Sequence, residues 1–149
     1  MKAEPTAIQD QYPDQLAVCF GCGRLNAHGH QLKSFPDGDR VVARFRPQPY
    51  HEAIPGFVYG GLLASLIDCH GTGTAAWAAT QADPSGGPAR FVTGRLEVSY
   101  RKPTPLGPEL ELVATVRERG ERKIVVDVTL AAEGVVTVEG TVVAVRMRD

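Results

Sequence analysis

The sequence has no excess of charge of one sign, because 16 Lys and Arg residues are matched by 17 Asp and Glu residues among 149. Nucleic acids and anionic lipid surfaces attract proteins through basic patches or a strongly positive net charge. A polyanionic macromolecule, nucleic acid included, is therefore not an expected partner. The length, with 43% hydrophobic residues, is that of one compact domain and leaves no room for a second.

A long apolar run is also missing. The longest stretch without Asp, Glu, Lys, Arg or His is Ala53–Ile67, which contains glycine and is shorter than the about 20 apolar residues of a membrane helix. Near the N-terminus, Glu4 and Pro5 stand where a secretory signal requires a basic start followed by an apolar run. We therefore expect a soluble, cytoplasmic protein with no membrane partner.

Cysteine is scarce, with three residues in the chain, an odd number that gives no disulfide framework. Free thiols fit a reducing compartment. Cys19-x-x-Cys22, followed by His28 and His30, has some features of a zinc site. The spacing of the two histidines is shorter than the three to five intervening residues of common zinc fingers. A packed turn is the favoured interpretation of the cysteine pair, and no metal site is predicted.

Apolar periodicity predicts one long helix and six strands. The first fifteen residues lack periodicity and are expected to form a loosely held arm, so the domain division is 1–18 for the arm and 19–149 for the domain. Two strands are expected between Gln31 and Arg46, with a turn at Pro36-Asp37-Gly38-Asp39. The helix is predicted from Gly60 to about Gln81. Four Val-rich segments follow and predict an antiparallel meander: Ala89–Tyr100, Glu109–Glu118, Arg122–Ala132 and Val135–Met147.

The predicted helix is apolar nearly all round, which is typical of a buried helix. A strongly curved antiparallel sheet wrapped around one central helix is the α+β arrangement that buries it. Such a sheet leaves strand edges open, and pairing with a second copy of the chain covers them.

One acid, Asp68, interrupts this apolar helix. Burial of a carboxylate is costly unless a partner compensates it, so an acid in this position usually has a task. It lies on a stripe of small residues through which a ligand or another backbone can approach: Gly61, Ala64, Asp68, Gly71 or Thr72, Ala75 and Ala79. The alternative is a structural carboxylate bound to a neighbouring loop or to a partner subunit.

Gly60 and Gly61 fall in the predicted first turn of the helix. Backbone N–H groups at a helix N-terminus have no intrahelical partner, and without side chains they are open to a ligand oxygen. The pair is therefore a candidate oxyanion hole. A tight entry turn is the alternative explanation.

Three ordered motifs resemble the hotdog-fold acyl-CoA thioesterases of the phenylacetate-pathway type. The segment 55–68, PGFVYGGLLASLID, resembles the family signature P-G-x-V-H-G-G-x-x-x-x-L-x-D. The segment 93–107, TGRLEVSYRKPTPLG, is similar to the strand T-x-x-L-x-V-x-Y-x-R-P-x-P-L-G of the same family. The opening CFGCGRLN at 19–26 is similar to the C-F-x-C-G-x-x-N start of one thioesterase branch. Three motifs in order are more specific than any one of them.

The resemblance implies roles for three residues, and a fourth residue departs from the family pattern. Asp68 would be the general base or nucleophile, the Gly61 N–H would polarise the thioester carbonyl, and Thr93 would help to place the attacking water. Tyr59 departs from the family pattern, which has His there; a phenol with a pKa near 10 donates a hydrogen bond but is no base near neutrality. Strict alternation puts Thr93 on the face opposite Leu96 unless the intervening glycine forms a bulge.

The resemblance also implies an enzyme that hydrolyses a small or medium acyl-CoA as a homodimer or dimer of dimers, with no cofactor and no metal. Gly60 and His51 are expected at the rim of the substrate pocket. Arg101 or Lys102 could hold the phosphates of coenzyme A. The competing hypothesis is a non-hydrolytic acyl-CoA-binding module in which Tyr59 has replaced the catalytic group and Asp68 is structural.

Two further patterns are set aside. Gly71-Thr72-Gly73-Thr74-Ala75-Ala76 matches a dinucleotide-binding fingerprint, but it lies inside the predicted helix and not in a strand-to-helix turn. His70, two residues after Asp68, points away from it along a helix, so a core or interface role is expected.

Overall fold

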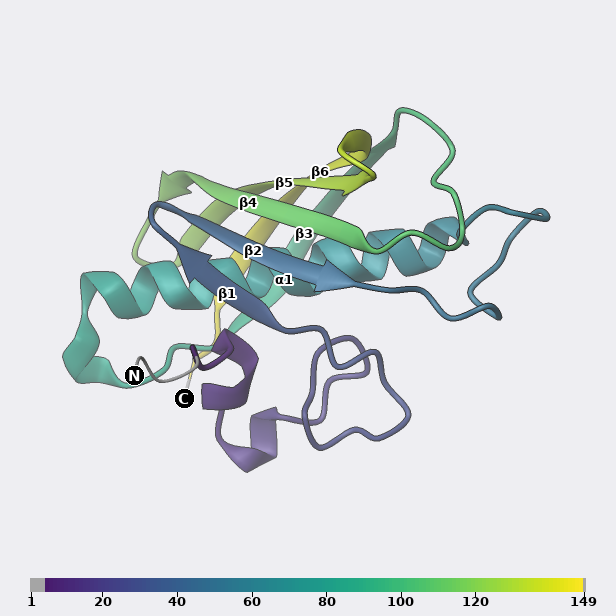
Figure 1. Ribbon diagram of the computed structural model, residues 1–149. Coiled ribbons are helices and arrows are strands. Elements are labelled where there is room, and N and C mark those ends of the chain that lie inside the picture. The colour runs from purple at the N-terminus through teal and green to yellow at the C-terminus, as the bar shows by residue number, and fades with distance from the viewer. Residues whose placement is uncertain (1–4, 149) are drawn as a thin grey trace.

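The computed structural model of the protein describes residues 5–148, which form one curved antiparallel sheet over one 23-residue helix (Figure 1). The α+β architecture predicted from the sequence is confirmed. Three short 3-10 turns complete the fold, η1 at Ile8–Gln11, η2 at Asp14–Leu16 and η3 at Pro84–Gly86. The helix and strands have these bounds: β1 Ser34–Asp37, β2 Arg40–Phe45, α1 Gly60–Ala82, β3 Phe91–Tyr100, β4 Leu110–Arg119, β5 Lys123–Ala132 and β6 Val135–Arg146.

The strand order is β1-β2-β4-β5-β6-β3, all neighbours being antiparallel. The predicted meander is confirmed for β4, β5 and β6 and is wrong for β3, which pairs with β6 at the far edge. The segment that connects β3 to β4, residues 101–109, can span about 30 Å when extended. Three strand spacings, about 14 Å, separate β3 from β4 in the sheet, so this connection is long enough. Prolines at 103, 105 and 108 disfavour a tight hairpin there, and so β3 and β4 lie apart.

The first hairpin is tighter than predicted. Pro36 and Asp37 pair within β1, and only Gly38 and Asp39 form the turn. Gly38 has a φ of 65°, a left-handed conformation that glycine adopts without strain. An edge strand tolerates proline because it needs no second hydrogen-bonding neighbour, which allows Pro36 to lie in β1.

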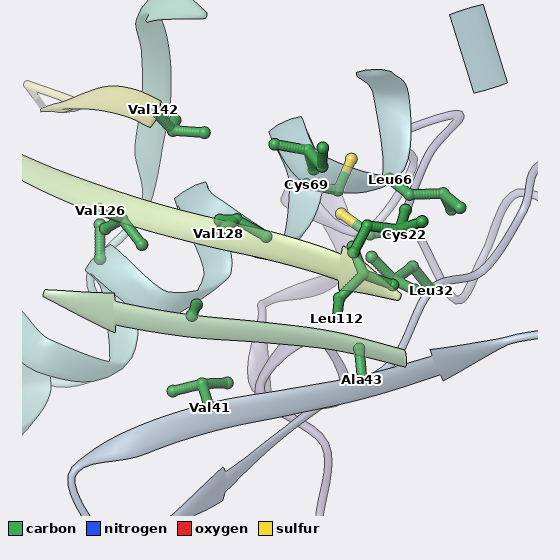
Figure 2. Packing of buried hydrophobic residues seen from close by; sticks show 14 of the residues in the cluster. Cys22, Leu32, Val41, Ala43, Leu66, Cys69, Leu112, Val126, Val128 and Val142 are labelled. Carbon is green, nitrogen blue, oxygen red and sulfur yellow. The ribbon is translucent and has the colours of Figure 1, made fainter. Parts of the chain in front are cut away.

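The helix packs closely on the sheet because glycines occupy the contacts. A Cβ at Gly71 would lie 2.4 Å from Val142 Cγ2, and a Cβ at Gly140 would lie 2.6 Å from Ile67 Cγ2. Figure 2 shows Val142 in this part of the core. The predicted stripe of small residues is accessible near the helix N-terminus and at Asp68. Farther along the helix the stripe is not accessible, because Ala75 and Ala79 are buried.

The prediction of a loosely held N-terminus is wrong for the described residues from 5 onward. Ile8 and Tyr12 are buried in the core. Gln9 donates from Nε2 to Ser34 Oγ (2.9 Å) and accepts from the Ser34 N–H (2.8 Å), which joins η1 to β1 (Figure 1). The polar composition of the segment concealed these buried positions. The boundary at residue 18 stays a prediction, and Met1–Glu4 lie outside the described residues.

His70 is fully buried, as the prediction of a core role required. Its Nε2 lies 2.9 Å from the Val41 carbonyl oxygen and its Nδ1 lies 2.8 Å from Ser34 Oγ. Because a carbonyl only accepts, these bonds assign the proton to Nε2 and leave Nδ1 to accept from the Ser34 hydroxyl. A neutral imidazole therefore satisfies the network.

In the described part of the chain, no helix combines the length and the apolarity that crossing a membrane requires.

Candidate active site

Asp68 lies near the middle of α1 with its side chain partly exposed, and it meets Thr93 of β3. The Thr93 hydroxyl donates a hydrogen bond to Asp68 Oδ1. The register of β3 against β6 shifts between Thr93 and Arg95, so Gly94 forms the bulge on which this geometry depends. A Cβ at Gly94 would lie 2.9 Å from Val145 Cγ2, which favours glycine in the bulge.

The surroundings of Asp68 make it a better proton acceptor than an acid in water. Burial raises the pKa of Asp68, and the Thr93 hydrogen bond opposes that rise. Cys19 raises the pKa further, and Arg90 lowers it. The net shift is upward. Within residues 5–148, Thr93 is the one side chain that hydrogen-bonds the Asp68 carboxylate, so its second oxygen is open to a water molecule.

The helix N-terminus presents backbone donors as predicted. The N-cap residue Tyr59 makes no side-chain capping bond, and the first backbone N–H of the helix to bond within it is that of Leu63, which donates to the Tyr59 carbonyl (3.3 Å). The N–H groups of Gly60 and Gly61 precede that bond and are the helix-end donors with positive partial charge. These groups are suited to bind an oxygen that gains negative charge.

Two tyrosines flank the glycine pair. A Cβ at Gly61 would lie 2.5 Å from the Tyr59 ring, and a Cβ at Gly60 would lie 3.4 Å from the Tyr100 ring. The Tyr100 hydroxyl donates to the Gly60 carbonyl oxygen (2.7 Å). This role of Tyr100 was not predicted from the sequence, although the alternation of Leu96, Val98 and Tyr100 along β3 could have placed Tyr100 on the helix side.

A hollow of about 350 Å³ opens beside these tyrosines, and we call it the entry hollow. It brings together three of the predicted substrate-binding residues, Gly60, Arg101 and Lys102. Arg101 Nε lies 3.2 Å from Glu139 Oε2. The full lining consists of Ala53, Ile54, Phe57, Val58, Gly60, Leu63, Tyr100, Arg101, Lys102, Pro103 and Thr104.

His51 does not line the entry hollow, in contrast to its predicted place at the rim. Its carbonyl accepts the Tyr59 N–H (2.8 Å), so its backbone lies at the entry to the helix. Its Nδ1 accepts the Gln48 N–H (2.9 Å), and its ring meets the ring of Tyr50 at an edge. The side chain is thereby held in a local aromatic group.

Asp68 and the Gly61 N–H are separated along one helix. Seven residues at a rise of 1.5 Å each place them about 10 Å apart, too far for both to touch one carbonyl group. Beside them, β3 is the edge strand of the sheet, and it exposes Val92, Leu96 and Tyr100. One chain therefore holds the two parts of a candidate site but does not close it.

A match to a protein-family model identifies the family of this chain. Residues 55–139 match the model of the family described as Thioesterase superfamily. The chain belongs to the thioesterase superfamily. The matched range includes all of α1, the Asp68–Thr93 pair and the lining of the entry hollow apart from Ala53 and Ile54.

Two solved structures share the fold of this chain. A thioesterase superfamily protein from Shewanella loihica PV-4 is 49% identical, with a TM-score of 0.70 over 82% of this chain and 96% of that one. The BH2602 protein from Bacillus halodurans, solved with CoA, is 26% identical, with a TM-score of 0.66 over 85% of this chain and 82% of that one. The hotdog fold predicted from the sequence is confirmed.

A curated relative carries a more specific name. The acyl-coenzyme A thioesterase THEM4 of Xenopus laevis is 34% identical over 85 residues, which are 57% of this chain. The match covers 34% of THEM4, so the chain spans about a third of the length of this relative. The expectation of a thioester hydrolase agrees with the family and with this relative.

Proposed function

We propose that the protein is an acyl-CoA thioesterase that converts a small or medium acyl-CoA and water into a free acid and CoA. The observation that carries the proposal is the Asp68–Thr93 pair, a partly exposed carboxylate in an apolar helix bound by one hydroxyl donor. Such an acid has a cost in stability that a catalytic task explains. The acyl-CoA thioesterase name of one relative and the CoA bound to another support the substrate class.

In the proposed reaction Asp68 accepts a proton from water as the water oxygen attacks the thioester carbonyl carbon. Thr93 holds the carboxylate in place and orients the water. The carbonyl oxygen gains negative charge, which the Gly61 N–H at the positive helix end stabilises. The carbon–sulfur bond then breaks, and the CoA sulfur takes the proton from Asp68. Atoms and charge balance without a metal or cofactor in this sequence of steps.

The proposed active unit is a homodimer, and a dimer of dimers is compatible with it. Asp68 of one chain and Gly61 of a second copy would together complete one site, since the two groups of a single chain lie about 10 Å apart. The exposed edge of β3 offers unpaired N–H and C=O groups to a second β3.

Sedimentation equilibrium of the purified protein is expected to give a dimer or a multiple of it at assay concentrations. Specific activity should fall on dilution below the dimer dissociation constant. A stable monomer with full activity would overturn the shared site.

Thr93 offers a test of the hydroxyl. The change Thr93→Val keeps the shape and removes the donor, so kcat is expected to fall about 10-fold, the effect of losing a hydrogen bond to a charged group. Thr93→Ser restores the hydroxyl and is expected to stay within about threefold of the wild type. Equal kcat for the Thr93→Val and wild-type proteins would show that the Thr93 hydroxyl has no role in catalysis.

We assign the chain to the phenylacetate-pathway type on its three motifs. It differs from the pattern of that type at Tyr59. The Tyr59 ring lies where a Cβ on Gly61 would be, and the family pattern has His at the tyrosine position. The variant Tyr59→His is expected to hydrolyse acyl-CoA at the wild-type rate or faster, measured as kcat/KM. A fall of about 10-fold or more in a folded variant would mean that the phenol has its own role in this protein.

The placement of Arg101 and Lys102 at the entry hollow supports a CoA phosphate site there. His51, whose carbonyl accepts the Tyr59 N–H at the helix entry, stays a proposed substrate-binding residue.

The second candidate function is a non-hydrolytic acyl-CoA-binding module, favoured by Tyr59 in place of the family histidine. A panel of acyl-CoA thioesters of increasing chain length separates the two. We expect loss of the thioester and equimolar free CoA, detected by mass spectrometry, with a preference for short or medium chains. Stoichiometric binding of intact acyl-CoA without release of CoA across the panel would support the binding module.

A further inference from the structure

The three cysteines of the chain come together next to the proposed active site. Cys19 and Cys22 lie in the loop before β1, and Cys69 follows Asp68 on α1. Their sulfur atoms all lie within 4.8 Å of one another, and those of Cys19 and Cys69 are 3.8 Å apart. Figure 2 shows Cys22 and Cys69 beside Leu66 and Leu32. No other part of the described chain supplies a cysteine, so the cluster uses every thiol of the protein.

The spacing of the sulfurs fits a metal ion better than a set of unrelated core thiols. A tetrahedral ion with metal–sulfur distances of about 2.3 Å separates its sulfur ligands by about 3.8 Å. That is the separation of Cys19 and Cys69. A disulfide would require sulfurs about 2.05 Å apart, so the described state is the reduced one, which can bind a metal.

The loop from 17 to 32 is built to present Cys19 and Cys22 to the helix. A Cβ at Gly21 would lie 2.3 Å from Cys69 Sγ, and a Cβ at Gly23 would lie 2.4 Å from the Cys19 backbone nitrogen. The Gly23 N–H donates to the Cys19 carbonyl (2.8 Å), and the Leu32 N–H donates to the Gly21 carbonyl (3.1 Å). The glycines and the backbone bonds therefore fix the cysteine pair against Cys69.

A second observation points to a ligand at the cluster. The Tyr12 hydroxyl is buried and has no hydrogen-bond partner within the described residues. Tyr12 belongs to the same cluster of buried residues as Cys22 and Cys69. The Arg90 guanidinium lies 4.7 Å from the centre of the Tyr12 ring. A buried hydroxyl without a partner, next to a cation and in the same cluster as the thiols, points to a ligand bound among these groups.

We propose that Cys19, Cys22 and Cys69 bind a thiolate-preferring divalent ion, Zn²⁺. Three thiolates and Zn²⁺ carry a net charge of −1, which Arg90 offsets. Cys19 is the partly exposed member, so a water molecule that reaches the cluster past Cys19 could complete four-coordination. The histidines that follow the cysteine pair in sequence are not ligands, because His30 packs against Phe20 and the cluster takes Cys69 instead. The ion would join the N-terminal loop to the helix turn that carries Asp68.

The test measures metal content and does not depend on the proposed hydrolysis. Full-length protein, reduced and supplied with excess Zn²⁺, is freed of unbound metal by gel filtration, and zinc is counted by mass spectrometry. We expect one zinc per chain and a melting temperature several degrees above that of chelator-treated protein. Cys69→Ser and Cys22→Ser should lose the zinc, while the matched variants His28→Ala and His30→Ala keep it.

Wild-type protein loaded with Co²⁺ covers the case in which a cysteine variant does not fold. Thiolate ligation is expected to produce sulfur-to-cobalt charge-transfer absorption, which Zn²⁺ then displaces. The proposal fails if reduced wild-type protein binds neither ion, if cobalt gives no such absorption, or if both cysteine variants retain stoichiometric zinc.

Discussion

The Asp68→Asn protein is expected to hydrolyse acyl-CoA at least about 100-fold more slowly than the wild type, with KM changed by less than about threefold. Asparagine keeps the size of the side chain and can still accept the Thr93 hydrogen bond. It loses the negative charge that accepts a proton from water. The loss therefore appears in kcat, because the base acts in the transition state and not in binding.

The matched control is Asp83→Asn, which removes an exposed carboxylate at the end of the same helix. Its activity and melting temperature are expected to equal those of the wild type. A folded, dimeric Asp68→Asn protein that releases CoA at the wild-type rate would rule out Asp68 as the base. A loss of stability with unchanged activity in the folded fraction would assign it the structural role considered from the sequence.

His70→Ala is expected to lower the free energy of unfolding by about 3–5 kcal/mol at pH 7. The change leaves a cavity in the core, removes the imidazole donor to the Val41 carbonyl and removes the acceptor of the buried Ser34 hydroxyl. Urea denaturation at equilibrium measures the effect. The control is His28→Ala at an exposed position, expected to change stability by less than about 0.5 kcal/mol. Equal stability of the two variants would contradict the buried network.

The same histidine makes stability depend on pH. Burial lowers the pKa of His70 to about 4, while the bond to the Val41 carbonyl opposes this shift. The unfolded chain, with a pKa near 6.5, binds the proton first, so stability is complete above about pH 6.5 and falls towards pH 4. The loss amounts to about 3 kcal/mol. His70→Gln has no imidazole to titrate, so its free energy of unfolding is expected to fall by about 3 kcal/mol less than that of the wild type between about pH 6.5 and pH 4. Parallel pH profiles of the two proteins would contradict the assignment of this pH dependence to His70.

The sequence carried enough information to predict the helix and its acid. A long run without outward-facing charge predicts a buried helix, and one carboxylate within it stands out. Gly60 and Gly61 begin α1 at the predicted place, so the backbone donors follow from the glycine pair. The bulge at Gly94 was predictable because alternation alone puts Thr93 on the wrong face.

Contacts between segments that are distant along the chain could not be predicted from the sequence. The edge position of β3 depends on which strand accepts it, and alternation along one strand says nothing about its neighbour. Cys69 is far from Cys19 along the chain, and only the packing of the N-terminal loop against α1 brings their sulfurs together. The burial of Ile8 and Tyr12 likewise depends on η1 meeting the helix and β1, a tertiary contact that the local polarity of the segment concealed.

In the proposed mechanism Asp68 activates water for the hydrolysis of an acyl-CoA. The most direct measurement is a single turnover in ¹⁸O-labelled water, with enzyme in excess over acyl-CoA and the oxygen content of the product acid read by mass spectrometry. The acid formed in this first turnover is expected to carry one solvent oxygen, and the Asp68 carboxylate is expected to stay unlabelled. An unlabelled acid with label on Asp68, or acyl-CoA that stays intact, would contradict the proposed mechanism.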